Sequence, residues 1–489
     1  MRQNALAAAI ALVSLACPMM AGAVGLNPRG IGQVLIYPYY TVNKSQDTLV
    51  SVVNVSGVSK AVQVRFVEGY NGRDTLDFVL YLSPHDVWTA AISQTADDGG
   101  AVLKTSDTSC TFPAIPATGA PFLSSGYDGS GSAPADGGPT AITRTREGSI
   151  EFLAGADITT GSPTDIAITH VQNGNPGVGI PPGCATLTAT SALADEAAPT
   201  GGILGSGTII NVGEGTFFAY DAQAIQGFTS IPLFAVATDG VVSLADANSD
   251  EALGAAARAY MTVEDGVPFW LDYEFGIDAV SAVLTADAIY NEYFVAASLG
   301  ATTDWVVTFP TKNFYVDKGL YPANHTEPFV EPFNSQQSGV SYVVTPTTSY
   351  DREEGLPSVG CGFPCPASPP QELAYQVNVV PFTNDANFSL GTPSGVLGST
   401  LTSLQIPPYG DDGYVAMDLA SGDGGEHQLP GGIDINRQGV TLNGLPVTGF
   451  MVYNIINAQA QPGLLANYGG AFVHRATASC VGDTVNCAH

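Results

Sequence analysis

Four short runs of β-branched and aromatic residues near the start of the chain constrain its fold most strongly. Turn residues separate these runs, which cover residues 34–37, 48–55, 61–67 and 75–82. In the third run apolar side chains alternate with others, so one strand face carries Val62, Val64 and Phe66. Asn71-Gly72 precedes the fourth run, and both residues tolerate the positive φ that a tight hairpin needs. We therefore expect residues 24–93 to be an N-terminal β segment of four or five strands.

Strand patterns return in the second half of the chain. They cover residues 269–275, 304–309, 340–345, 373–380, 414–419 and 450–456. Asn443-Gly444 gives a second hairpin signal, and Pro446 favours a sheet edge for the strand that follows. Residues 301–489 are thus a C-terminal β segment that we expect to pack with residues 24–93. Because strong strands stand at both ends, we expect a mainly β fold, a β-sandwich completed by N- and C-terminal strands.

The middle of the chain differs in composition. Gly, Ser, Thr, Ala and Pro dominate residues 94–210, which predicts an insertion of long loops around strands at 149–153 and 166–171. Residues 211–300 predict a mixed α/β segment with one or two short helices, at 250–261 and 279–293. The sequence contains no repeat of the length that solenoids and propellers require.

The N-terminal residues 1–23 have the order of a cleavable export signal. Arg2 precedes an apolar run over residues 5–17, and the small residues Ala21-Gly22-Ala23 follow. The run is too short for a spanning helix, so we expect cleavage after Ala23. No later stretch of the sequence is long and apolar enough to span a bilayer, so we expect no transmembrane helix after cleavage. Lipid attachment at Cys17 is an alternative with unfavourable flanking residues. We expect an exported protein that is extracellular, periplasmic or on the cell surface.

The net charge of the chain limits the classes of partner that we expect it to bind. The sequence holds 45 Asp plus Glu against 15 Lys plus Arg, a formal net charge of −30. Nucleic acid is excluded as an expected partner, because phosphate binding needs clustered Lys and Arg. Such an acidic chain attracts divalent cations, although solubility or salt tolerance explains the charge equally simply.

Six cysteines follow the export signal, and an even number in an exported chain predicts disulfides. They are Cys110, Cys184, Cys361, Cys365, Cys480 and Cys487. Proximity favours Cys361–Cys365 and Cys480–Cys487, which leaves Cys110–Cys184 to join the ends of a long loop. A zinc site is the alternative, but neither close pair has a second cysteine or histidine pair at zinc spacing.

Two patterns are candidate sites. Trp270, Asp272 and Glu274 share one strand face, where two carboxylates and a stacking ring suit sugar binding or glycoside hydrolysis. An ordinary solvent-facing strand explains this face as well. Asp246, Asn248 and Asp250 begin like a calcium loop, with oxygen ligands at alternate positions. The later positions lack the glycine and the glutamate of such a loop, so an acidic turn that caps a helix is the alternative.

The function follows from composition rather than from a motif, because the sequence has no Gly-x-Ser-x-Gly, Ser-x-x-Lys or His-Glu-x-x-His pattern. The acidic, Lys-poor, Gly- and Thr-rich chain resembles bacterial surface-layer proteins in composition. This resemblance implies a non-enzymatic surface-layer-like, fibre or adhesion subunit that associates with itself, with Ca²⁺ bridging carboxylates. One alternative is a secreted carbohydrate-binding protein or glycoside hydrolase that contacts surface glycans. Another is an outer-membrane β-barrel, which the cysteines and the long Gly/Pro stretches oppose.

Overall fold

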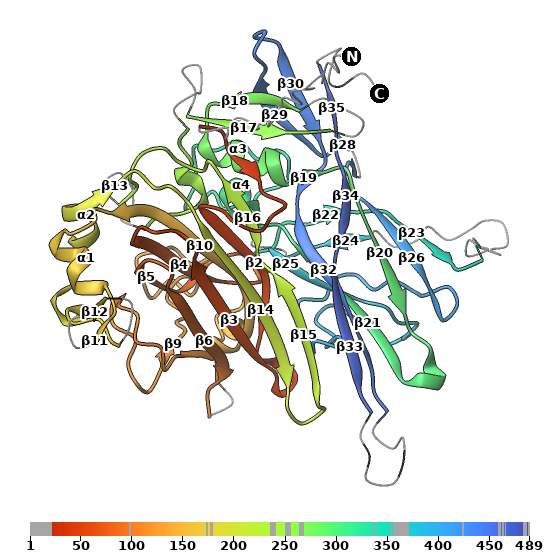
Figure 1. The fold of residues 1–489 in the computed structure, drawn as a ribbon. Helices are drawn as coiled ribbons and strands as arrows, with labels where there is room; N and C mark the ends of the chain where they lie inside the picture. Colours follow the sequence, from red (N-terminus) through yellow and green to blue (C-terminus); the bar gives the residue numbers. More distant parts are fainter. Residues whose placement is uncertain are drawn as a thin grey trace, which may run out of the picture.

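The computed structural model shows a mainly β protein in which every ladder between named strands is antiparallel (Figure 1). It describes residues 22–96, 99–172, 175–176, 179–234, 241–249, 256–263, 268–334, 336, 338–353, 355, 371–422, 425–457, 461, 464, 466–482 and 487. The described part contains four short α-helices: α1 (Pro163–Ile168), α2 (Ser191–Asp195), α3 (Gly276–Leu284) and α4 (Lys312–Val316). The prediction of a mainly β fold is confirmed.

Two sheets from the first half of the chain form a sandwich. The eight-stranded sheet has the order β1 (Gly25–Leu26), β16 (Gln223–Gln226), β2 (Val34–Thr41), β10 (Glu147–Ile158), β4 (Lys60–Glu68), β5 (Asp74–Leu82) and β8 (Thr111–Phe112), with β13 (Glu196–Ala197) also paired to β10. The six-stranded sheet has the order β15 (Thr216–Asp221), β14 (Ile203–Asn211), β3 (Asp47–Asn54), β6 (Val87–Gln94), β7 (Ala101–Lys104) and β9 (Ala120–Pro121). Trp88 of β6 and Phe152 of β10 meet between them, with ring centroids 6.0 Å apart.

The central strand β10 explains how the larger sheet is covered on both faces. All twelve of its residues are buried. Ile150 and Phe152 point into the sandwich core, whereas Glu151 lies on the opposite face and pairs with Arg65 of β4 at 2.9 Å. A buried carboxylate requires such a partner, because desolvation disfavours its charge. Hence the segment 94–210 supplies the middle of the sheet as well as loops.

Three further sheets come from the second half of the chain (Figure 1). The five-stranded sheet has the order β17 (Ala257–Met261), β18 (Phe269–Tyr273), β29 (Gln428–Ile433), β30 (Gly439–Asn443) and β35 (Ser479–Val481). One four-stranded sheet has the order β23 (Thr347–Asp351), β26 (Asp412–Asp418), β20 (Ala288–Phe294) and β34 (Arg475–Thr477). The other has the order β25 (Val377–Pro381), β21 (Ala301–Thr308), β32 (Thr448–Ile455) and β33 (Tyr468–Val473). Two-stranded pairs are β11 (Val171–Gln172) with β12 (Asn175–Pro176), β19 (Thr285–Ala286) with β31 (Leu445–Pro446), β22 (Val343–Val344) with β24 (Glu372–Leu373), and β27 (Ser421–Gly422) with β28 (Gly425–Glu426).

Buried polar contacts join the C-terminal elements to the N-terminal sandwich. Arg73 Nε, after the β4 strand, donates to Asp317 Oδ2 at 2.6 Å, and both side chains are buried. Asn313 Nδ2 of α4 donates to the carbonyl oxygen of Gly72 at 3.0 Å. Apolar residues of β21, β25 and β32 also share the core of the sandwich. The C-terminal sheets therefore pack on the sandwich as further layers.

Three local predictions fail in whole or in part. The first half of the strand expected at 166–171 lies in the helix α1, because Ser162 caps this helix by accepting a bond from the backbone nitrogen of Asp165 at 3.2 Å and Pro163 favours its first turn. The helix expected at 250–261 is the strand β17 over its last five residues, where Tyr260 pairs with Trp270. Residues 250–255 lie outside the described part. The helix expected at 279–293 is helical only to Leu284, where α3 ends, and the strands β19 and β20 follow.

The two Asn-Gly signals have different outcomes. Gly72 has φ +72° and joins the paired strands β4 and β5, so the first hairpin is confirmed. Gly444 has φ +106°, but it leads from β30 into β31, which pairs with β19 instead. A Cβ there would lie 1.8 Å from the carbonyl oxygen of Ala286, so this glycine permits a close backbone approach between sheets. The second hairpin prediction is wrong.

Two of the predicted disulfides lie in the described part of the chain. Cys110 and Cys184 are bonded, as are Cys480 and Cys487. Cys361 and Cys365 lie outside the described residues, so their pairing stays a prediction.

Candidate functional site

The face predicted from Trp270, Asp272 and Glu274 does not present two available carboxylates. Asp272 is 6% exposed and accepts from Arg258 Nε at 2.6 Å and Nη2 at 3.1 Å. Trp270 packs on Tyr260, with ring centroids 5.6 Å apart, and only Glu274 is exposed. A carboxylate held in a two-pronged ion pair is poorly placed for acid–base work. This face is better explained as a strand pair closed by its own side chains.

The residues of the predicted calcium loop have structural partners. Asp246 Oδ2 accepts from the backbone nitrogen of Ser243 at 2.7 Å, and the two residues form a capping box. Asn248 bridges to Thr229 through its backbone. Asp250 lies outside the described residues. Among the residues that are described, no three His, Cys, Asp or Glu side chains form a group that could hold a metal ion. The calcium site stays a prediction.

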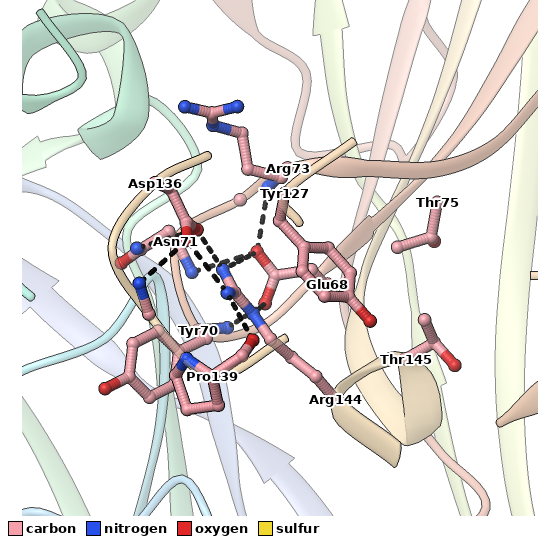
Figure 2. Close-up of polar contacts among 12 residues, drawn as sticks. Glu68, Tyr70, Asn71, Arg73, Thr75, Tyr127, Asp136, Pro139, Arg144 and Thr145 are labelled. Atoms are coloured by element: carbon pink, nitrogen blue, oxygen red, sulfur yellow. Dashed lines mark hydrogen bonds and ion pairs between the residues drawn. The ribbon is translucent and has the colours of Figure 1, made fainter. Parts of the chain in front are cut away.

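A buried charged cluster surrounds Arg144, at the turn between β4 and β5 (Figure 2). Its Nε donates to Glu68 Oε2 at 2.7 Å, and its Nη1 donates to Asp136 Oδ1 at 3.1 Å. The guanidinium also lies over the rings of Tyr127, at 4.3 Å, and Tyr70, at 4.7 Å. Although burial opposes the charged form, Glu68 and Asp136 raise the pKa of Arg144 above its usual value. We call these five residues the Arg144 cluster.

Glu68 also organises the backbone of the turn. Its carboxylate accepts from the backbone nitrogens of Tyr70 at 2.7 Å, Asn71 at 3.0 Å and Arg73 at 3.0 Å. Arg144 Nη1 bonds the carbonyl oxygen of Pro139 as well, at 3.1 Å. The charges of the Arg144 cluster are therefore committed to each other and to the loop that they fix. The cluster acts as scaffold.

A cleft of about 580 Å³ lies beside the Arg144 cluster, with Tyr70 in its wall. The other lining residues are Val330, Glu331, Ser338, Tyr342, Val344, Glu372, Leu390 and His427. His427 is buried between the carbonyl oxygens of Pro328 and Val344, each 3.2 Å from a ring nitrogen, and burial lowers its pKa. The Tyr70 ring already contacts Arg144 and Tyr375. This cleft thus offers little free aromatic surface.

A second hollow has much more exposed ring surface, and we call it the aromatic groove. Its volume is about 650 Å³, and it lies where β20, β23 and β26 of one sheet approach β32 and β33 of the next. It is lined by Glu292, Tyr293, Phe294, Asp351, Arg352, Asp412, Gly413, Tyr414, Met451, Tyr453, Ile455 and Phe472. This volume is within the range of small-molecule sites in proteins.

Strand alternation places the rings of the aromatic groove. Val415 and Met417 of β26 point into the core, so Tyr414 points outward and is 43% exposed. Opposite Tyr414 in register, Tyr350 stacks on it with centroids 4.8 Å apart and planes 9° apart. On the other wall Phe472 is 50% exposed.

The two walls meet through the ring of Tyr453. It lies parallel to Phe472, with centroids 6.3 Å apart, and meets Phe294 edge to face at the same separation. Phe294 belongs to β20 and Tyr453 to β32, so this contact spans the two sheets. Phe294, Tyr453 and Phe472 therefore form one continuous set of ring contacts between the two sheets.

Carboxylates accompany these rings. Asp351 Oδ1 accepts from the backbone nitrogens of Glu353 at 3.0 Å and Gly355 at 2.7 Å. Burial, with the charges of Asp351 and Asp412, raises the pKa of Tyr293 at the same place. Arg352 is exposed and its Nε donates to Glu353 at 2.8 Å. The groove can therefore stack flat rings and accept hydrogen bonds at their edges.

A third arrangement contains an acid, a histidine and a hydroxyl group. His170 Nδ1 lies 3.6 Å from Asp86 Oδ2, and its Nε2 lies 3.2 Å from Thr108 Oγ1. Asp86 also accepts from Ser83 and Ser109. Neither the cleft nor the aromatic groove is lined by these residues. We interpret them as ties between the turns next to Cys110.

No protein-family model, curated protein or solved structure matches this chain. Within the described ranges, no helix is both long and apolar enough to cross a membrane.

Proposed function

We propose that this protein is an exported cell-surface adhesion protein that binds glycans through the aromatic groove. The groove itself carries this proposal. Sugar rings have apolar C–H faces and hydroxyl edges, which match aromatic faces beside carboxylates and a guanidinium. Tyr414, Phe472 and Tyr453 supply the faces, and Asp351 and Asp412 supply acceptors.

Location and charge support this function. The export-like N-terminus, the two disulfides and the scarcity of Lys suit a protein outside the cytoplasm. A net charge of −30 disfavours phosphate-rich ligands such as nucleic acid. Surface glycans fit both this location and an exposed aromatic groove.

A glycan array probed with the mature protein tests the proposal. We expect binding that Tyr414→Ala and Phe472→Ala each weaken about tenfold, because a stacked ring contributes roughly 1 kcal/mol beyond its burial. Trp270→Ala is the matched control, since it removes a ring from the face that the sequence suggested. Loss of binding in Trp270→Ala alone, or an array without signal, would contradict the proposal.

A structural role through self-association is the second candidate, favoured by exposed apolar side chains on β15 and β33. Phe217 is 64% exposed, Tyr468 61% and Val473 62%. The two strands lie side by side, because a Cβ on Gly469 would meet the Phe218 ring at 2.5 Å. Such surface is a common basis for association. Phe217→Ala should lower self-association in light scattering and leave glycan binding unchanged.

A further inference from the structure

The charged residues of the aromatic groove indicate which glycans it accepts. We propose that the groove selects glycans with free amino groups, such as polymers of unsubstituted hexosamine, over acetylated and uronic acid glycans. This inference rests on the proposed glycan-binding function and adds the substrate class. It depends on how carboxylates and rings alternate across two strands.

Strand pairing makes aromatic rings and carboxylates alternate on one face of the sheet. Glu292 of β20 lies directly opposite Tyr414 of β26, and Phe294 lies opposite Asp412. Directly opposed residues of an antiparallel pair share one face, with Cβ atoms about 5 Å apart. A sugar that stacks on either ring therefore carries its substituents next to a carboxylate. An ammonium group at such a position gains a charge-assisted hydrogen bond.

The single cation among the described lining residues does not cancel these charges. Arg352 donates to Glu353 and lies 3.7 Å from Asp412. Glu292, Asp351 and Asp412 stand against it, so the described lining has a formal charge of −2. Glu353 and the charge of the whole chain add to the negative potential, which attracts ammonium groups and repels uronates.

Pairing also leaves Glu292 toward solvent rather than toward the core. Its neighbours Asn291 and Tyr293 are 3% and 1% exposed, whereas Glu292 itself is exposed. Its backbone carbonyl accepts from Trp305 Nε1 at 3.1 Å, which fixes the strand at this residue. The Glu292 carboxylate is therefore held at the groove on a rigid strand.

Calorimetry with three oligomers of equal length tests the inference. The probes are a β-1,4-linked glucosamine oligomer, its fully N-acetylated form and a galacturonic acid oligomer, at mildly acidic pH where the amines are protonated. We expect the amino oligomer to bind about tenfold tighter than the acetylated one, and the uronate not to bind. Glu292→Gln and Asp412→Asn should each bring the affinity for the amino oligomer closer to the affinity for the acetylated one.

The controls separate failure of the inference from failure of the function. Glu274→Gln removes an exposed carboxylate away from the groove and should keep the preference. If Glu274→Gln lowers the preference as much as Glu292→Gln, the overall charge is responsible and the inference is overturned. Equal binding of amino and acetylated oligomers overturns the inference and leaves the proposed function standing. Absence of binding by all three oligomers and by the array overturns the proposed function.

Discussion

The Arg144 cluster and the aromatic groove are built from the same kinds of residue and differ in exposure. In the cluster an arginine lies between two tyrosine rings and two carboxylates, and its side chain is 4% exposed. In the groove Arg352 and its partner Glu353 are 69% and 68% exposed, beside rings that face solvent. Because the Arg144 cluster is buried, its charged groups bond to one another. The charged groups of the aromatic groove are exposed and are therefore available to a ligand.

This difference shows why composition alone does not identify a site here. A buried ion pair must be complete, because an unpaired buried charge is costly. An exposed pair contributes little to stability and can exchange its partner for a ligand.

Removing the arginine from each region should give very different stabilities. Arg144→Met leaves Glu68 and Asp136 buried without their partner, so we expect the free energy of unfolding to fall by about 3–5 kcal/mol. Arg352→Met should leave the urea midpoint unchanged. Urea unfolding followed by circular dichroism measures both variants. Equal losses of stability in the two variants would remove the contrast between cluster and groove.

The two described disulfides should contribute to the free energy of unfolding according to the lengths of the loops that they close. The sequence separation is 74 residues for Cys110–Cys184 and 7 for Cys480–Cys487. Replacing each pair by serine should lower the free energy of unfolding by about 4 and about 2 kcal/mol, respectively, in the chain-entropy description. Neither change should alter glycan affinity, because no cysteine is among the described residues that line the groove. A larger loss for the shorter loop would reject this order.

Lys312 should make stability depend on pH, in contrast to the carboxylate-paired Arg144. It is 1% exposed, and its Nζ donates to the carbonyl oxygens of Ser341, Ala374 and Tyr375. Burial lowers the pKa of Lys312 to about 7. A lowered lysine pKa gives stability that is present at high pH and is lost as the pH falls towards the folded pKa.

The unfolded chain therefore binds this proton more readily than the folded chain between about pH 10 and pH 7. We expect the wild type to lose about 3 kcal/mol, relative to Lys312→Met, between about pH 9.5 and pH 7. The variant shares all other titrating groups, so the difference between the two pH slopes isolates Lys312. Parallel slopes would show that the lysine titrates normally.

Self-association should depend on calcium, and we expect this effect to be smaller than the effects on stability predicted above. We expect millimolar Ca²⁺ to enlarge the particles seen in light scattering and a chelator to reverse this, since the cation bridges carboxylates. Phe217→Ala should weaken association, and Tyr414→Ala should not. Monomers that ignore Ca²⁺ would leave glycan binding as the sole proposed role.

Much of the fold could be predicted from residues that alternate in short strands. Val62, Val64 and Phe66 lie in the sandwich core as expected. The wrong predictions of secondary structure have two causes. Either a local capping signal competes with the strand pattern, or pairing with a distant strand decides the structure. Ser162 and Pro163 start a helix where a strand was expected, and pairing with β18 makes residues 257–261 a strand despite their helical composition.

The wrong helix prediction also explains why the face with Trp270, Asp272 and Glu274 was taken for a binding site. With residues 257–261 read as helix, nothing in the sequence placed Arg258 opposite Asp272, so that carboxylate seemed free. The aromatic groove was missed because its residues span positions 292–472 and meet only through non-local strand pairing. The available signal was an aromatic residue on the outward side of a strand, as at Tyr414.

Hydrogen–deuterium exchange with and without the glucosamine oligomer tests the division between scaffold and site most directly. We predict that the ligand slows exchange in peptides from β20, β26 and β32, while peptides around Glu68 and Arg144 are protected in both states. Protection gained instead around Tyr70 or Trp270, with the groove strands unchanged, would contradict the account.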